Sequence, residues 1–419
     1  MNKVPRSSSD IKMSILAYVP SQYKYLTSKG KGCGGWLRFG RVLKISNKED
    51  IQYHLIEFKP ELLNPLIFGI FQILVSMILA FIRTIKMVKQ NNVHLILSPT
   101  EVPQAIVLSY LSSKITGRRF VAFLNSVPCY GSVDVQTFKK SDEKPSYKSL
   151  FRVMKSARKL RLRAILGALM WYVAFKMLGS PSTHIICLSP VVADELSKLG
   201  LKGHIVSVYP GNGINYNEIS SLLLKADDKK YDAIFAAGNF HPQKGIFEAV
   251  KIWGDVIKRR PEAKLAIAGI VHYECPFVID ELNSLIWDLG LHRNVSIICD
   301  PFKGMTQKEL WREMNRSKMF VYPSRKDVWP LVIGEALACG LPVVAYNLPG
   351  IAYAYGNCPA LFLTKVGDVE GAARIVIRLL SDNSLLKELS RKAQQYAKNH
   401  DWNHVVELER KAYLTILKS

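Results

Sequence analysis

The sequence predicts an α/β protein of two doubly wound domains, each built on a parallel sheet. Short apolar runs alternate with helical segments along the whole chain of 419 residues. The alternation restarts after a turn-rich segment, Pro210-Gly211-Asn212-Gly213. In addition, 48% of the residues are hydrophobic, which is enough to fill a core in each half. Alternating strands and helices are typical of parallel sheets that helices cover on both faces.

The first domain is predicted to span residues 1–210. A glycine-rich loop over 29–36 follows its first strand, and a helix is expected over 37–46. Ser189 and Pro190 favour a helix over 189–199, because serine is a good N-cap and proline suits the first helical turn. The predicted strands of this domain lie at 14–19, 52–58, 93–97, 120–124, 184–188 and 204–208.

The second domain is predicted to span residues 211–400, and an amphipathic helical segment follows over 401–419. The strands expected in this domain lie at 231–237, 264–268, 295–298, 319–321 and 342–345. The helices expected between and after them lie at 246–259, 281–289, 309–316, 335–339 and 369–380.

The most informative segment sets two carboxylates, Asp327 and Glu335, eight residues apart. Between them lies a short turn, Val328-Trp329-Pro330-Leu331, and Gly340 suits the left-handed residue just past a helix. The amides after Trp329 should therefore form an exposed helix N-terminus, which attracts phosphate. A phosphate site flanked by carboxylates that bind hydroxyls indicates a nucleotide-sugar site. The alternative is a buried helix–strand pair with incidental acids.

This segment resembles the E-x7-E signature of retaining GT-B glycosyltransferases of family 4. Two other segments also resemble the family: Phe235-Ala236-Ala237-Gly238 with Lys244-Gly245, and the linker over 209–215. The resemblance implies two Rossmann-like domains facing across a cleft, with the 401–419 helix packing back on the first domain. The matching residues of the signature are Pro323, Ser324, Asp327 in place of the first Glu, Leu331, Glu335, Ala336, Ala338, Gly340, Pro342, Val343 and Val344.

The resemblance also implies roles for residues in a retaining hexosyltransferase. Glu335 would accept hydrogen bonds from the ribose hydroxyls, Asp327 would hold hydroxyls of the donor sugar, and Lys244 would neutralise the diphosphate. Gly34 and Gly35 resemble the N-terminal glycine-rich loop of the family, and the alternative for them is a flexible turn. Their basic neighbours Lys29, Lys31 and Arg38 favour an anionic ligand. The remaining residues expected at the nucleotide sugar are Gly238, Asn239, Val328, Trp329, Leu331 and Val332.

The chain departs from the family pattern at three positions. Asp327 is one methylene shorter than Glu, and Asn239 stands where the family has Arg, a loss that Arg325 or Lys326 could compensate. The strand at 120–124 ends in Asn125 and Ser126 without the His of many relatives. Retaining transfer in the family lets the leaving phosphate assist the acceptor, so no protein base is required. The departures keep open a non-catalytic GT-B-fold binding or scaffold subunit.

The net charge of +23 is concentrated in the first half of the chain. Residues 1–215 contain 30 Lys and Arg against 11 Asp and Glu. The densest basic run, Lys139 to Arg163, leads into an aromatic apolar stretch over 164–175, which favours binding to an anionic membrane surface. The alternative is a solvated basic loop before a core helix. The apolar run Leu66 to Ile82 favours a buried or membrane-dipping helix over a membrane span, which needs about 20 residues.

These patterns predict a nucleotide-sugar donor and a lipid-linked acceptor or anionic membrane surface as partners, and no nucleic acid. No D-x-D motif or His/Cys cluster is present, so neither a metal nor a cofactor is expected. The seven cysteines occur without a CxxC pair, which favours reduced thiols. The N-terminus lacks a signal-peptide pattern. The expected location is therefore cytoplasmic and peripheral, at the inner face of the cell membrane.

Overall fold

The computed structural model describes residues 13–20, 34–46, 51–58, 66–126, 162–201, 203–208, 211–222, 229–271, 275 and 277–419, without the side chains of 34–37, 66–71, 162–168 and 204. The predicted basic run from Lys139 lies outside these residues up to position 161. The chain divides into two compact units, one of residues 1–211 with 405–419 and one of residues 212–404.

The first unit contains a six-stranded sheet in the order β2-β1-β3-β4-β5-β6, and every pair of neighbours is parallel. All residues of β1 and β3 are buried, which explains why these strands are apolar runs rather than alternating patterns. The strands are β1 Met13–Pro20, β2 Ile51–Phe58, β3 Leu95–Ser98, β4 Arg119–Leu124, β5 Thr183–Cys187 and β6 His204–Ser207. Each one overlaps a predicted strand.

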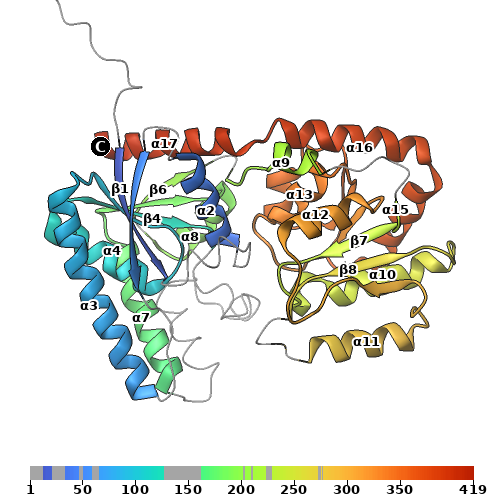
Figure 1. Ribbon diagram of the computed structural model, residues 1–419, viewed down its shortest axis with the longest axis horizontal. Coiled ribbons are helices and arrows are strands. Elements are labelled where there is room, and N and C mark those ends of the chain that lie inside the picture. Colours follow the sequence, from blue (N-terminus) through green and yellow to red (C-terminus); the bar gives the residue numbers. More distant parts are fainter. Residues whose placement is uncertain are drawn as a thin grey trace, which may run out of the picture. The chain divides into compact units, whose positions relative to one another are not determined.

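Helices cover both faces of this sheet (Figure 1). Their bounds are α2 Gly34–Ser46, α3 Leu66–Gln90, α4 Pro103–Thr116, α7 Leu162–Leu178, α8 Pro190–Lys198 and α17 Trp402–Lys418. On one face, α4 packs between α3 and α7. The predicted cap of α8 is confirmed, because Ser189 Oγ accepts a hydrogen bond from the Val192 amide at 3.4 Å. In the part of the chain that the structure describes, no helix meets the length and hydropathy that a membrane span requires.

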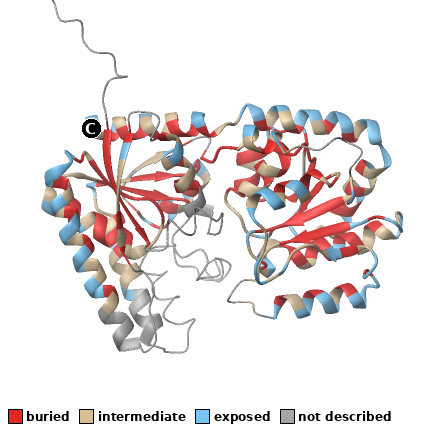
Figure 2. Cartoon of the chain, viewed as in Figure 1, coloured by how far each residue is buried: buried red, intermediate tan, exposed pale blue. Residues whose placement is uncertain are grey.

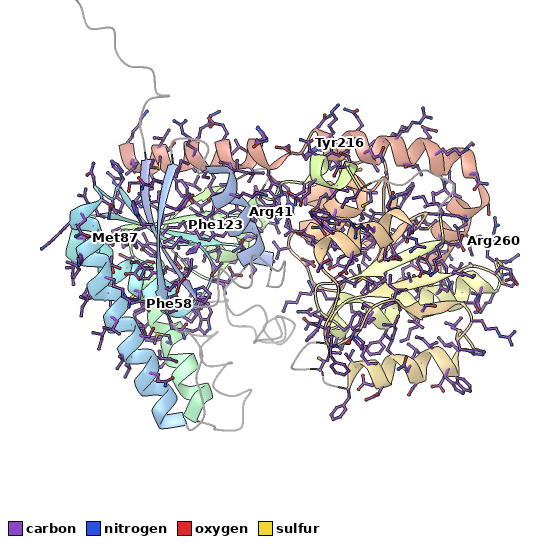
Figure 3. The ribbon with its side chains drawn as sticks, viewed as in Figure 1. Arg41, Phe58, Met87, Phe123, Tyr216 and Arg260 are labelled. Atoms are coloured by element: carbon purple, nitrogen blue, oxygen red, sulfur yellow. The ribbon has the colours of Figure 1, made fainter. Side chains whose placement is uncertain are left out.

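The core under α3 and α4 is apolar with one polar centre. Tyr18 on β1 is fully buried, and its hydroxyl bonds to the hydroxyls of Thr84 and Ser112. Phe58 and Met87, labelled in Figure 3, belong to the same cluster. Burial raises the pKa of Tyr18 to about 12. The hydrogen bonds satisfy the hydroxyl, as a buried polar group requires.

The prediction that Arg38 faces an anionic ligand is wrong. Arg38 is 2% exposed. Its guanidinium donates to Glu409 of α17 at 2.7 Å and to the Gly211 carbonyl at 2.9 Å. The guanidinium also lies over the Phe123 ring, 3.8 Å from its centroid. The Arg38 side chain therefore joins α2, to which it belongs, to α17 through Glu409 and to β4 through Phe123, all within the first unit.

Gly34 and Gly35, expected in a loop, form the first turn of α2. The helix begins at Gly34, three residues before the predicted start at 37. The first amides of a helix have no partner within it, so a glycine pair is tolerated there better than in the helix interior.

The second unit contains another six-stranded sheet, in the order β12-β11-β10-β7-β8-β9, with parallel pairs throughout. Its strands are largely buried, as Figure 2 shows in red. The strands are β7 Ala233–Ala236, β8 Leu265–Ala268, β9 Val295–Ile297, β10 Phe320–Tyr322, β11 Val343–Tyr346 and β12 Leu361–Thr364. Among these, β12 was not predicted.

Two layers of helices enclose the second sheet (Figure 1). Helices α10 Ile246–Ile257, α11 Val278–Asp288 and α15 Val369–Ser381 form one layer, in which α10 packs on both others. Helices α9 Tyr216–Ser220, α12 Gln307–Asn315, α13 Leu331–Ala338 and α16 Asn383–Lys398 form the other, and α14 Pro349–Tyr355 follows β11. Strands β7 and β10 are neighbours at the centre of the sheet, which brings the loops after them together.

Candidate functional site

The loop after β7 forms a tight turn that only glycine can close. His241 accepts a hydrogen bond from the Gln243 amide through Nδ1 at 3.2 Å, and residues Pro242–Lys244 form the short 3-10 helix η2. Gly245 follows with φ of +80°. A Cβ at this position would lie 2.0 Å from the Pro323 carbonyl oxygen. The loop therefore lies directly against the segment that follows β10.

Hydrogen bonds connect these two loops at one acceptor. The Gln243 carbonyl accepts from the Ser324 hydroxyl at 3.2 Å and from the Arg325 amide at 2.9 Å. One substructure therefore contains both Lys244-Gly245 and Pro323-Ser324, although 78 or more positions separate them in the sequence.

Lys244 and Asp327 meet in this substructure. The Lys244 ammonium donates to Asp327 Oδ2 at 2.6 Å, and the buried Tyr322 hydroxyl donates to the same oxygen at 2.8 Å. The Lys244 side chain is 30% exposed and the Asp327 side chain 14%. The other carboxylate oxygen accepts from the Val328 amide at 3.0 Å. Burial, together with the Asp327 charge, raises the pKa of Tyr322 well above its usual value, so the phenol remains a donor.

The turn that follows Asp327 is held from three sides. Asn212 donates to the Trp329 carbonyl at 3.3 Å, and the Tyr355 hydroxyl donates to the Pro330 carbonyl at 2.8 Å. A Cβ on Gly350 would lie 2.2 Å from the Val328 carbonyl, so α14 lies against the turn as well. Trp329 is buried beside the rings of Tyr353 and Tyr355. The backbone of the turn is therefore pre-organised.

Helix α13 begins immediately after this turn, as the sequence predicts. Its first residues are Leu331 and Val332, and no side chain caps its N-terminus. Gly238, at the end of β7, has no heavy atom within 4 Å of the position where a Cβ would stand. Asn239 is half-buried beside it. Uncapped amides and open backbone of this kind are what an anion needs for close approach.

Glu335 lies in the second turn of α13, and its carboxylate accepts from Gln307 Nε2 at 2.5 Å. Gln307 is the first residue of α12, whose start is fixed by a capping box between Thr306 and Glu309. Glu335 is thus held by α12, whereas Asp327 is held by Lys244 and Tyr322. The pairing of Glu335 with Gln307 was not predicted.

Arg325 is one of the two cations expected to compensate for the missing Arg at Asn239, but it forms an ion pair with Glu248. Its Nε donates to Glu248 of α10 at 2.5 Å.

Tyr322 was missed in the sequence, although a hydroxyl-bearing residue at the carboxyl end of a buried strand is the available signal. Ligands of parallel sheets bind at such strand ends.

The first unit carries a separate polar cluster at the carboxyl ends of β3 and β4. Glu101 Oε2 accepts from the backbone amide and the side-chain amide of Asn125, both at 3.2 Å, and Oε1 accepts from the Ser126 hydroxyl at 2.9 Å. Glu101 was missed in the sequence, where it follows a predicted strand closely. Gly34 and Gly35 belong to this unit, at the start of α2.

Comparison with curated proteins relates the chain to enzymes of glycan and disaccharide synthesis. Residues 223–400 match the family model described as "Glycosyl transferases group 1". The capsular polysaccharide biosynthesis glycosyltransferase CapM of Staphylococcus aureus is 25% identical, over 63% of this chain and 70% of that protein. An exopolysaccharide phosphotransferase of Streptomyces coelicolor is 31% identical over 37% of this chain, but the match covers 15% of that protein. Trehalose synthase of Pyrococcus horikoshii is 24% identical, over 49% of this chain and 48% of the enzyme. The chain therefore spans half or less of the last two relatives.

Comparison with solved structures shows the fold of the whole chain. HepE of Anabaena, in complex with UDP and glucose, aligns with a TM-score of 0.65 and 18% identity, over 97% of this chain and all of that one. Sucrose-phosphate synthase of Thermosynechococcus elongatus aligns with a TM-score of 0.70 and 15% identity, over 97% of this chain and 99% of that one. The predicted α/β fold of two doubly wound domains, GT-B, is confirmed.

Proposed function

We propose that this chain, whose residues 223–400 match the glycosyl transferases group 1 family model, is a retaining glycosyltransferase. Its donor is a nucleoside-diphosphate sugar, and its acceptor is lipid-linked, at the cytoplasmic face of the cell membrane. The observation that carries the proposal is the network of Lys244, Asp327 and Tyr322, which joins the two segments expected at the donor.

In this proposal the donor diphosphate binds the Lys244 ammonium and the first amides of α13, at Leu331 and Val332. Asp327 keeps the ammonium in position before the donor arrives, and Tyr322 keeps Asp327 in position. The leaving diphosphate gains negative charge as its bond to the sugar breaks, and a pre-positioned cation stabilises that charge. The open backbone at Gly238 and the side chain of Asn239 complete the phosphate side.

Glu335 supplies the nucleoside end of the site. Its carboxylate exchanges the Gln307 amide for the ribose hydroxyls, which are stronger partners because each hydroxyl can donate to a charged acceptor. The Asp327 carboxylate, already bonded by two side chains, has less capacity for donor-sugar hydroxyls than the longer Glu of the family pattern. UDP is the first nucleotide to test, since HepE was solved with it.

The transfer itself needs one bond exchange at the anomeric carbon. The bond from C1 of the sugar to the phosphate oxygen breaks, and a bond from C1 to the acceptor oxygen forms on the same face. The acceptor proton passes to the leaving phosphate oxygen. No step requires a base at Asn125 or Ser126, or a metal. The Glu101 cluster, at the carboxyl edge of the first sheet, supports acceptor hydroxyl binding by that unit.

The test is sugar transfer from UDP-sugars and GDP-sugars to lipid-linked acceptors by the full chain and its Lys244→Ala variant. We expect the variant to lower kcat by about 10²–10³-fold, the effect typical of removing one group that stabilises transition-state charge. Lys303→Ala is the matched control, because that side chain is 85% exposed. NMR should show that the transferred sugar in the product has the same anomeric configuration as in the donor. Full activity of Lys244→Ala, or an inverted product, would overturn the proposal.

A further inference from the structure

Among the described side chains of α3, residues 72–90, five large apolar ones are exposed. Their exposed fractions range from 37% to 58%, although this helix also buries Ile73, Ala80 and Val88 against the core. Single exposed apolar residues are normal on protein surfaces, but contiguous groups mark binding surfaces. The five residues, called the α3 patch below, are Leu74, Val75, Ile78, Leu79 and Ile82.

The α3 patch forms one continuous face. Successive helical residues are rotated by about 100°, so the five side chains occupy an arc of about 140°. They extend along the axis for about 12 Å. Figure 2 shows that the outer side of α3 is exposed or half-buried over its described length. The patch is therefore a surface rather than a set of scattered side chains.

The same face of α3 becomes basic toward its C-terminus. Arg83, Lys86 and Lys89 are all exposed. By the same helical rotation, Lys86 and Lys89 fall within the arc of the patch and Arg83 lies about 40° beyond it. An apolar face that continues into a basic one is the pattern of segments that bind anionic lipid surfaces.

The neighbouring helices extend this character. Helix α4 packs on α3 and α7 and exposes Leu111 and Ile115, while α7 exposes Leu169. Figure 1 shows α3, α4 and α7 on the same side of the first sheet. The sequences of these three helices contain no Asp or Glu. These three helices therefore offer no acidic group to the basic residues of α3.

From this arrangement we infer that the α3 patch inserts into an anionic lipid bilayer, with Arg83, Lys86 and Lys89 on the lipid headgroups. A second copy that packs the same three helices against this face fits it less well, because those helices bring more basic residues and no Asp or Glu. The inference rests on the proposed function in one respect, since it explains how the enzyme meets a lipid-linked acceptor. It adds the surface and the lipid chemistry that do so.

The test is co-sedimentation of the full chain with vesicles of phosphatidylcholine, with or without phosphatidylglycerol. The first variant, Ile78→Asn with Ile82→Asn, removes apolar contact, and the second, Lys86→Gln with Lys89→Gln, removes charge. The control, Trp287→Asn with Phe302→Asn, changes two residues that are 72% and 70% exposed in the second unit. All substituted side chains are exposed, so folding should be unaffected, which circular dichroism checks.

We expect wild type and control to bind the mixed vesicles, and each patch variant to bind at least about tenfold more weakly, a loss of 1.4 kcal/mol. Raising the salt from about 0.1 M to about 1 M should weaken wild-type binding, because the Debye length falls from about 10 Å to about 3 Å. Equal binding by all variants, or none by wild type, would overturn the inference. So would a wild-type dimer that Ile78→Asn with Ile82→Asn dissociates in sedimentation velocity.

Nucleotide binding separates this inference from the proposed function. The patch variants should bind nucleotide as wild type does, because the donor residues lie in the other unit. If the patch variants lose vesicle binding and no nucleotide binds wild type, the proposed function is wrong and the inference about the lipid-binding surface is supported. If nucleotide binds wild type and the patch variants bind vesicles as wild type does, only the inference about the lipid-binding surface is wrong.

Discussion

At the scale of single residues, the proposed donor site depends on how Asp327 is held. Its carboxylate accepts from Lys244 and Tyr322 on one oxygen and from the next amide on the other. This arrangement gives Asp327 a positioning role toward Lys244 that its place in the signature did not predict. Tyr322 is the part of the network that can be removed without removing charge.

Substituting Tyr322→Phe should change both stability and its dependence on pH. Loss of a hydrogen bond to a charged group costs about 1.5–3 kcal/mol of unfolding free energy. The raised pKa of Tyr322 means that the folded state keeps a proton which the unfolded state loses near pH 10. The stabilisation that this group provides is therefore fully present below about pH 10 and is lost as the pH rises further.

Urea unfolding between neutral pH and the alkaline range measures this effect. The free energy of unfolding of wild type should fall by about 1.4 kcal/mol per pH unit for each such tyrosine above about pH 10. Tyr322→Phe should make that fall shallower. Tyr18→Phe, at a second tyrosine whose pKa burial raises to about 12, should do the same. Parallel curves for wild type and both variants would contradict the role of burial.

At the scale of elements, the site depends on the approach of the η2 turn to the loop after β10. Gly245→Ala would place a Cβ 2.0 Å from the Pro323 carbonyl oxygen at a φ of +80°. Left-handed strain and overpacking together should cost about 2–5 kcal/mol. Gly254→Ala in α10 is the control, because its Cβ would make only ordinary contacts, with Leu289 and Leu291. That variant should be neutral or stabilised by up to about 1 kcal/mol. Thermal unfolding of both variants measures the difference, and equal melting points would refute the close approach.

The attachment of α17 rests on a buried ion pair. Glu409→Leu leaves Arg38 charged and buried, which should cost about 3–5 kcal/mol. The double variant Arg38→Met with Glu409→Leu removes both charges and should recover much of that loss. Denaturant unfolding of the singles and the double gives the coupling energy. A double variant as unstable as the sum of the singles would show that the pair is not coupled.

The elements that were predictable are those with a strong local pattern. Strands β1 and β3 are buried apolar runs, and Ser189 with Pro190 marks the start of α8. In contrast, α4 has no clear amphipathic stripe, because it buries three serines where it packs on α3 and α7 and exposes Leu111 and Ile115. Strand β12 is four residues long, three half-buried and one buried, and carries no clear alternation. Such elements are specified by tertiary packing.

The same distinction holds for the site. Asp327 and Glu335 were predicted as site residues because they occur within a long ordered pattern, and Lys244 was predicted from its place before Gly245 after a strand. Their contacts were not predictable, because the Lys244–Asp327 bond joins positions 83 apart through the close approach at Gly245. Arg38 shows the opposite outcome, since its partner Glu409 lies 371 positions away and turns an expected ligand group into a structural one.

At the scale of the whole molecule, the two units carry different chemistry. The second unit contains the network of the donor signature, and the first contains the Glu101 cluster and the α3 patch. Most of the excess positive charge also lies in the first half of the chain. We expect donor binding to be insensitive to salt in comparison with lipid binding, because the donor network is partly buried and the patch is exposed.

Nucleotide binding by the full chain is the most direct test of the central claim. Calorimetric titration with UDP, GDP and ADP should be made on wild type, on Glu335→Ala and on the control Glu388→Ala, whose side chain is half exposed on α16. One nucleotide should bind wild type and the control equally. It should bind Glu335→Ala at least about tenfold more weakly, since hydrogen bonds to a charged group contribute about 1.5–3 kcal/mol. If no nucleotide binds wild type, or Glu335→Ala binds as well as wild type, the donor site is contradicted and a non-catalytic GT-B-fold subunit becomes the better account.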